Sequence, residues 1–186
     1  MADEDPPSLP QGTRVVVLTV SDGVASGSRA DESGNAVAAR LAALGGSVDR
    51  GVVADDLTAI ASMFRTAAGD HELVVSTGGT GLTPRDVTPE ALRSVIDYEI
   101  PGIGEAMRAG GRRSTPLADL SRSLGGVVGR TLALCLPGSP RGALESLAAV
   151  EALLGHALET LAGPHDHGRP ATPAVPDDRG QEEDAD

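Results

Sequence analysis

The stretch LVVSTGGTGLTPRDVTPEA, from residue 73 to residue 91, decides the fold class. The apolar run that begins at Leu73 indicates a buried β-strand, and a turn rich in glycine follows it directly. Thr88, Pro89 and Glu90 then predict a helix start, with an N-cap hydroxyl, a first-turn proline and an acid near the positive helix end. A strand that passes through a tight turn into a helix is the repeating unit of α/β proteins.

Comparable patterns occur along most of the chain. Apolar, β-branched runs predict strands at residues 13–21, 47–54, 71–77 and 129–138, and periodic apolar residues predict helices at 33–46, 57–69 and 141–163. Residues 98–126 are expected to be irregular, with one short helix near 102–109. Alternating strands and helices predict a three-layer α/β/α sandwich around a mostly parallel central sheet.

The composition excludes several classes of protein. A formal charge of −12 over 186 residues argues against a nucleic-acid partner. No apolar run is long enough for a membrane span, and the single cysteine excludes an internal disulfide, so a cytoplasmic location is expected. All 15 basic residues are arginines, which excludes lysine-based phosphate loops and Schiff bases. One domain is expected at 13–163, between disordered acidic segments at 1–12 and 164–186.

Polar residues and glycines gather where the predicted strands end. These segments are Ser21-Asp22, Asp55-Asp56, Thr77-Gly78-Gly79-Thr80-Gly81 and Pro137-Gly138-Ser139. Ligands of parallel α/β sheets bind beyond the carboxyl ends of the strands, so these four segments predict one site.

The glycines of residues 78–81 favour an anion as the ligand. Glycine allows positive φ and a close approach of main chain to ligand, and consecutive N–H groups in such a turn can hold a phosphate. Thr77 and Thr80 add hydroxyl groups. The alternative is a tight strand-to-helix turn that binds nothing.

Asp86 is a carboxylate close to this predicted anion site. Repulsion between the two charges is removed by a divalent cation, and Mg²⁺ takes one or two carboxylates together with phosphate oxygens. Asp55 or Asp56 could supply the second carboxylate. The alternatives are that Asp56 caps the following helix and that Asp86 is a turn residue. Cys135, in the middle of a predicted strand, is expected to be a buried apolar residue.

The order of several motifs resembles the MoaB/Mog family, which includes molybdopterin adenylyltransferases and the G domain of gephyrin-like proteins. The motifs are LTVSDGVASGSRADESG, VVADD, STGGTGLTPRDVTPEA, EIPGIGEAMR and LADLSRSLGGVVGRTLALCLPGSP, and the resemblance covers about residues 13–163.

This resemblance implies a homotrimer that transfers AMP from Mg-ATP to molybdopterin before a partner protein inserts molybdate. It implies catalytic, metal-holding roles for Asp55 and Asp86. Residues Thr77, Gly78, Gly79, Thr80, Gly81 and Glu90 correspond to the nucleotide-phosphate site, and Ser21, Asp22, Ser121, Arg122, Pro137, Gly138 and Ser139 to the pterin site. Two other functions stay open: a non-catalytic molybdopterin carrier or scaffold, and a nucleotide-binding domain acting on another phosphorylated compound.

Overall fold

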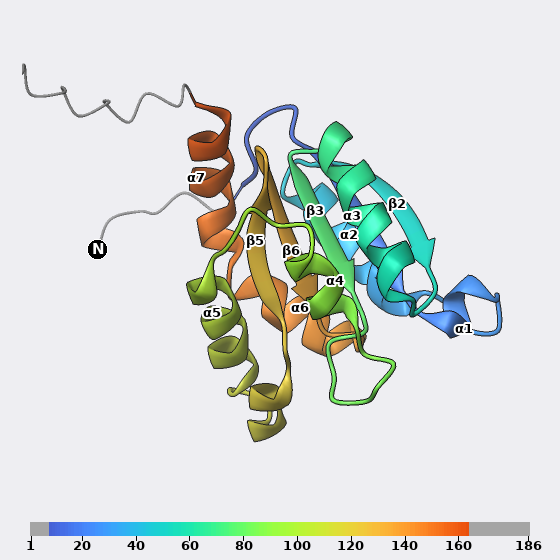
Figure 1. The fold of residues 1–186 in the computed structure, drawn as a ribbon. Helices are drawn as coiled ribbons and strands as arrows, with labels where there is room; N and C mark the ends of the chain where they lie inside the picture. The colour runs from blue at the N-terminus through green and yellow to red at the C-terminus, as the bar shows by residue number, and fades with distance from the viewer. Residues whose placement is uncertain (1–7, 164–186) are drawn as a thin grey trace, which may run out of the picture.

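The computed structural model describes residues 8–163, which form a six-stranded sheet with helices on both faces (Figure 1). The strand order is β2-β1-β3-β6-β5-β4. The four parallel strands are β1 (Arg14–Val20), β2 (Ser47–Val53), β3 (Leu73–Thr77) and β6 (Thr131–Leu136). Strand β5 (Leu124–Val128) pairs antiparallel with both β6 and β4 (Tyr98–Glu99). The predicted α/β/α sandwich with a mostly parallel sheet is confirmed.

Side chains that alternate along the strands separate two apolar clusters, one on each face of the sheet. Val15 and Val17 of β1 belong to one cluster, and Val16 and Leu18 belong to the other. The first cluster is covered by α2 (Glu32–Ala43), α5 (Pro101–Gly111), α6 (Pro140–Ala148) and α7 (Glu151–Ala162). The second is covered by α3 (Leu57–Asp70) and α4 (Thr88–Arg93). Both faces of the central strands are therefore buried, as their continuous apolar runs predicted.

Side-chain caps fix where three helices begin. Asp31 accepts from the N–H of Gly34 at the start of α2, and Asp56 accepts from Ala59 at the start of α3. Ser139 caps α6 in the same way. These helix starts follow the carboxyl ends of the parallel strands, so the N-termini lie at one edge of the sheet.

Residues 98–126 have more regular secondary structure than predicted. The short helix expected near 102–109 is confirmed as α5, but the segment also contains β4, the 3₁₀-helix η1 (Pro116–Leu120) and the start of β5. Two glycines in β5 explain the error, because glycine is unfavourable in strands by propensity. A Cβ at Gly125 would lie 2.7 Å from Ile103 Cγ2, and one at Gly126 would lie 2.8 Å from the carbonyl oxygen of Tyr98. Close packing requires glycine at both positions.

Two helix boundaries also differ from the prediction. The expected helix over 141–163 is divided into α6 and α7, which cover the same face of the sheet, so the apolar periodicity continues across the break. Thr88 is the first residue of α4 rather than its N-cap. Val87 holds the cap position and makes no side-chain cap bond there, while Thr88 is fully buried.

The domain begins before residue 13, because Leu9 packs into the core and is only 7% exposed. Its N–H donates to the carbonyl oxygen of Leu44 at 2.8 Å. The disorder expected for residues 1–7 and 164–186 lies outside the described residues. None of the helices within 8–163 combines the length and apolar character needed to cross a membrane.

Candidate functional site

The carboxyl ends of the four parallel strands lie in register at one edge of the sheet. Thr77 of β3 is paired with Thr19 of β1 on one side and with Leu136 of β6 on the other. The hydrogen bonds continue past the strands: Ser21 N–H donates to Val53 at 2.9 Å, and Gly78 N–H donates to Leu136 at 3.1 Å. The predicted convergence of the four strand-end segments is confirmed.

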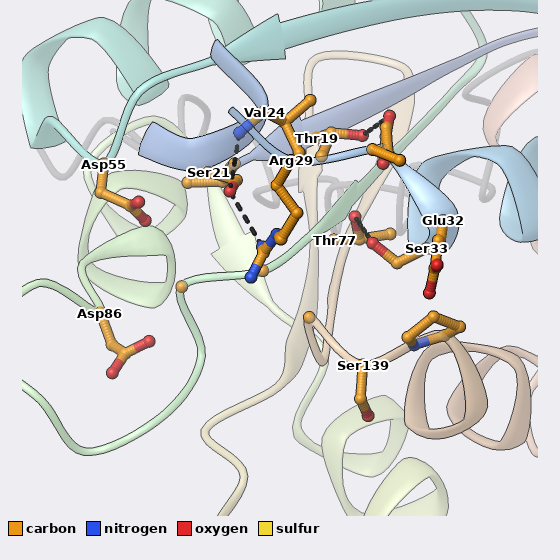
Figure 2. A pocket seen from close by; sticks show the side chains of 17 residues that line it. Thr19, Ser21, Val24, Arg29, Glu32, Ser33, Asp55, Thr77, Asp86 and Ser139 are labelled. Carbon is orange, nitrogen blue, oxygen red and sulfur yellow. Dashed lines mark hydrogen bonds between the residues drawn. The ribbon is translucent and has the colours of Figure 1, made fainter. Parts of the chain in front are cut away.

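A cavity of about 530 Å³ opens at this edge (Figure 2). The ends of β1 and β3, the start of α2 and the start of α6 form its walls. It is lined by Thr19, Val20, Ser21, Val24, Arg29, Ala30, Asp31, Glu32, Ser33, Asp55, Thr77, Gly78, Gly79, Asp86, Gly138, Ser139 and Pro140. We call this the first cavity.

The glycine turn after β3 has the main-chain conformation that the sequence predicted. Gly78 and Gly79 have φ values of +99° and +64°, which other residues adopt only with strain. The N–H of Gly78 is already used on Leu136. Within residues 8–163 the N–H groups of Gly79 and Thr80 donate to no acceptor, so these two, rather than Gly78, can bind an oxyanion.

Asp55, not Asp56, faces the first cavity. Asp56 caps α3, as one of the predicted alternatives stated. Asp55 is held by two reciprocal hydrogen bonds: Asp22 N–H donates to Asp55 Oδ2 at 2.9 Å, and Asp55 N–H donates to Asp22 Oδ1 at 3.0 Å. Arg85 pairs with the other oxygen of Asp22. The main-chain bond from Asp55 and the Arg85 guanidinium lower the pKa of Asp22. Asp22 thus supports Asp55 and does not line the cavity itself.

Asp86 lies against the glycine turn, because a Cβ at Gly81 would lie 2.9 Å from its Oδ2. Its Oδ2 accepts from Thr83 N–H at 2.9 Å and from Thr83 Oγ1 at 2.6 Å, so it is both a turn residue and a cavity residue. Burial raises the pKa of Asp86, but the Thr83 and Gly81 hydrogen bonds and the charge of Arg122 outweigh it, and the net pKa is lowered. The carboxylate is therefore ionised at neutral pH.

A second cavity of about 450 Å³ lies beside the first. It is lined by Gly79, Thr80, Gly81, Leu82, Asp86, Leu117, Leu120, Ser121, Pro137, Gly138 and Ser139. Gly79, Asp86, Gly138 and Ser139 line both cavities and form a shared wall.

Arg122 holds the main chain next to this wall through hydrogen bonds to two carbonyl groups. Its Nε donates to the carbonyl oxygen of Gly81 at 2.8 Å, and its terminal nitrogens contact the carbonyl of Asp86 and the carboxylate of Glu90. Its own N–H donates to the carbonyl oxygen of Thr80 at 3.0 Å. Neither Arg122 nor Glu90 lines either of these two cavities, so the guanidinium holds the loop that carries Asp86.

The residues expected to bind the pterin do not surround one cavity. Ser21 lines the first cavity, whereas Ser121 and Pro137 line the second. Arg29, Glu32 and Ser33 in the first cavity and three leucines in the second were not predicted. The signal for Glu32 and Ser33 was the capping pattern Asp-Glu-Ser-Gly at 31–34, which turns the start of α2 towards the strand ends.

The fold and the site together define a three-layer α/β protein with two adjoining cavities and two aspartates, Asp55 and Asp86, at the carboxyl edge of its sheet. Residues 16–156 match the family model described as "Probable molybdopterin binding domain". The chain belongs to this molybdopterin-binding family, and the resemblance to MoaB/Mog proteins is confirmed.

Similar proteins are known both by sequence and by structure. A molybdenum cofactor biosynthesis bifunctional protein of Synechococcus elongatus is 39% identical over 168 residues, which is 89% of this chain and 52% of that protein. The chain thus spans about half the length of the first curated relatives. A molybdopterin adenylyltransferase of Helicobacter pylori J99 is 34% identical over 158 residues, with 82% and 90% covered. The crystal structure of a molybdopterin biosynthesis enzyme, MoaB of Thermus thermophilus, has 46% identity and a TM-score of 0.74, with 82% and 98% covered. The names of these relatives all refer to molybdopterin or to the biosynthesis of the molybdenum cofactor.

Proposed function

We propose that this protein transfers AMP from Mg-ATP to molybdopterin, giving adenylyl-molybdopterin and pyrophosphate. The observation that carries the proposal is the wall shared by the two cavities, with Asp86 in it. A transfer reaction needs two substrates side by side with their reacting atoms in contact, whereas a carrier needs one cavity. The molybdopterin adenylyltransferase relatives support the choice of the two substrates.

The charge of the first cavity supports a metal-bound nucleotide. Its lining includes the carboxylates of Asp31, Glu32, Asp55 and Asp86 but only one guanidinium, from Arg29. A free triphosphate would be repelled there, so it has to enter with a cation. Within 8–163 no three metal-binding side chains form a cluster, and this fits Mg²⁺, which completes its shell with phosphate oxygens and water.

Asp55 and Asp86 are the two carboxylates that would hold the Mg²⁺. They line the same cavity, and Figure 2 shows the two side chains at one side of it, Asp55 above Asp86 in this view. When bound, the ion offsets negative charge on the α-phosphate and on the departing pyrophosphate.

The residues of the shared wall position the reacting groups. The terminal phosphate of molybdopterin attacks the α-phosphorus of ATP, the bond to the β-phosphate breaks, and pyrophosphate leaves with the electron pair. The attacking group is already an oxyanion, so no general base is needed. The N–H groups of Gly79 and Thr80 stabilise the oxyanions, each by about 3 kcal/mol if preorganised.

The decisive experiment compares two neighbouring aspartates. Asp55→Asn removes the carboxylate that faces the cavity, whereas Asp56→Asn makes the same change at a helix cap where asparagine works equally well. With molybdopterin, ATP and Mg²⁺, we expect pyrophosphate release to fall by about 100-fold or more in Asp55→Asn, because several kcal/mol of charge stabilisation is lost. Release in Asp56→Asn is expected to stay near that of the unmodified protein.

Two results would contradict the proposal. Equal rates in the two variants would remove Asp55 from the reaction. Binding of molybdopterin without any release of pyrophosphate by the unmodified protein would identify a carrier instead.

Asp86→Asn is expected to abolish AMP transfer while molybdopterin affinity stays within a few-fold.

The resemblance to MoaB/Mog proteins also supports a homotrimer in the cytoplasm and a partner protein that uses the adenylylated product. Light scattering after size-exclusion chromatography measures the oligomer directly. A monomer at micromolar concentration would exclude the trimer.

A further inference from the structure

Arg29 is the one basic side chain that lines the first cavity among the described residues. It lies in the loop between α1 (Asp22–Ala25) and α2, and Figure 2 shows its side chain reaching into the cavity, away from its own loop. No sequence pattern selects it, because it lies in a loop and not at a strand end.

The position of Arg29 is fixed by α1 and by Ser21. The N–H of Arg29 donates to the carbonyl oxygen of Gly23 at 3.0 Å. The two residues are in close contact, since a Cβ added at Gly23 would lie 3.4 Å from the Cβ of Arg29. Its Nη2 donates to Ser21 Oγ at 3.0 Å. Ser21 is 7% exposed and also accepts from Val24 N–H, so its oxygen cannot turn away without loss of a second hydrogen bond. Ser21 therefore directs the guanidinium.

The guanidinium of Arg29 lacks a strong acceptor within the part of the chain that the structure describes. Most arginines of residues 8–163 bond a carboxylate or a main-chain carbonyl. Within the same residues, the side chains of Arg29 and Arg113 make no such bond. Arg29 shares its cavity with four carboxylates and pairs with none of them, although charge-assisted bonds are the strongest that it can form.

We infer that Arg29 binds a phosphate group of the ligand in the first cavity and that Ser21 is its positioning residue. The planar guanidinium presents paired N–H donors that match phosphate oxygens. The inference rests on the proposed function only for the identity of the ligand. The phosphate belongs either to the β,γ-end of a nucleoside triphosphate or to a phosphomonoester such as the tail of the second substrate.

The test measures binding of three probes by calorimetry in the presence of Mg²⁺: ATP, inorganic pyrophosphate and glycerol 3-phosphate. The variants are Arg29→Gln, Arg29→Lys and, as the matched control, Arg113→Gln, which removes an exposed arginine outside both cavities. A charge-assisted hydrogen bond that is lost weakens binding by on the order of 10- to 100-fold. We expect that loss in Arg29→Gln, a smaller one in Arg29→Lys, and none in the control.

The pattern across the probes decides the source of the phosphate. Weaker binding of ATP and pyrophosphate assigns it to the nucleotide, and weaker binding of glycerol 3-phosphate alone assigns it to the second substrate. Unchanged binding of all three by a folded Arg29→Gln protein overturns the inference.

Ser21→Ala tests the positioning role. Ser21→Ala should weaken binding of the probe that Arg29→Gln affects, by several-fold in the otherwise unmodified protein. It should have no further effect on binding when Arg29→Gln is present, and a double-mutant cycle measures this difference. Equal effects in both backgrounds would show that Ser21 acts through the stability of α1 alone.

These binding assays do not measure AMP transfer. A protein without transferase activity could still show the Arg29 effect, and an active one could lack it, so the two proposals fail separately.

Discussion

Replacement of Gly78 by alanine tests whether the turn after β3 is fixed by packing between strands. Gly78 has a φ of +99°, and a Cβ there would lie 2.3 Å from the carbonyl oxygen of Val20 and 3.3 Å from its carbon. The obstacle is main chain in β1, which is paired on both sides, so no side-chain rotation can relieve it.

Two costs add up in Gly78→Ala. The left-handed conformation costs an alanine about 1–2 kcal/mol. Forcing an extra carbon into packed structure costs about 1–3 kcal/mol more. The sum of about 2–5 kcal/mol is a large share of the roughly 5–15 kcal/mol by which domains are usually stable. At about 2–4 °C for each kcal/mol, the expected fall in Tm is about 4–20 °C.

Gly129→Ala is the matched control. Gly129 also has a positive φ, +60°, but nothing lies within 4 Å of the position that a Cβ would take there, so only the conformational cost applies. Thermal unfolding followed by circular dichroism gives the Tm of each variant. Urea titration checks that the dependence of the unfolding free energy on urea concentration is the same in both. Equal losses of stability in the two variants would refute the steric argument, because the contact with Val20 would then contribute nothing.

Three further predictions concern single side chains. Thr88 Oγ1 is buried and has no partner within 8–163, so Thr88→Val should leave the Tm unchanged or raise it, and a clear loss would mean that the hydroxyl has an acceptor. Burial raises the pKa of Cys135 to about 12, so iodoacetamide at about pH 8 should label it only after unfolding; rapid labelling of the native protein would contradict this. The lowered pKa of Asp86 means that its ionised form stabilises the fold above the ordinary pKa of aspartate and that this is lost as pH falls through the lowered value. The stability difference between the unmodified protein and Asp86→Asn should therefore narrow below about pH 4, and a difference independent of pH would contradict the assignment.

The strands could be predicted because their chemistry is local. Val15 to Val17 and Leu73 to Val75 are apolar and β-branched or leucine, as strands buried on both faces require. Strand β5 has no such signal, since Gly125 and Gly126 are selected by the approach of Ile103 and Tyr98 from distant parts of the chain. The division between α6 and α7 is equally invisible, because no glycine or proline lies at Ala149 and Val150.

The candidate site follows the same division between local and distant causes. Asp55, Asp86 and the glycine turn could be predicted, because they directly follow strands or lie in the turn itself. Asp55 faces the cavity because Asp56 caps α3. The sequence alone does not show which of the two carboxylates is the cap, because that depends on the residue at which the helix begins. Leu117 and Leu120 are exposed residues of η1, and the fold brings them to the same cavity as the exposed Leu82 from the turn after β3, which no local pattern could show.

Two glycines at strand ends, Gly78 and Gly138, are in close contact beside the shared wall. A Cβ at Gly138 would lie 3.1 Å from Cα of Gly78, so the turns after β3 and β6 meet with no side chain between them. In-line transfer requires reacting atoms to approach within about 3–3.5 Å, and a side chain added at Gly138, which lines both cavities, would keep two ligands further apart. A carrier gains nothing from such a thin partition, because a single bound molecule does not need to be reached from the other side. On the proposed function, glycine at both strand ends is therefore a requirement of the reaction as well as of the turn, and Asp86, which lines both cavities, would lie beside the transferred phosphate.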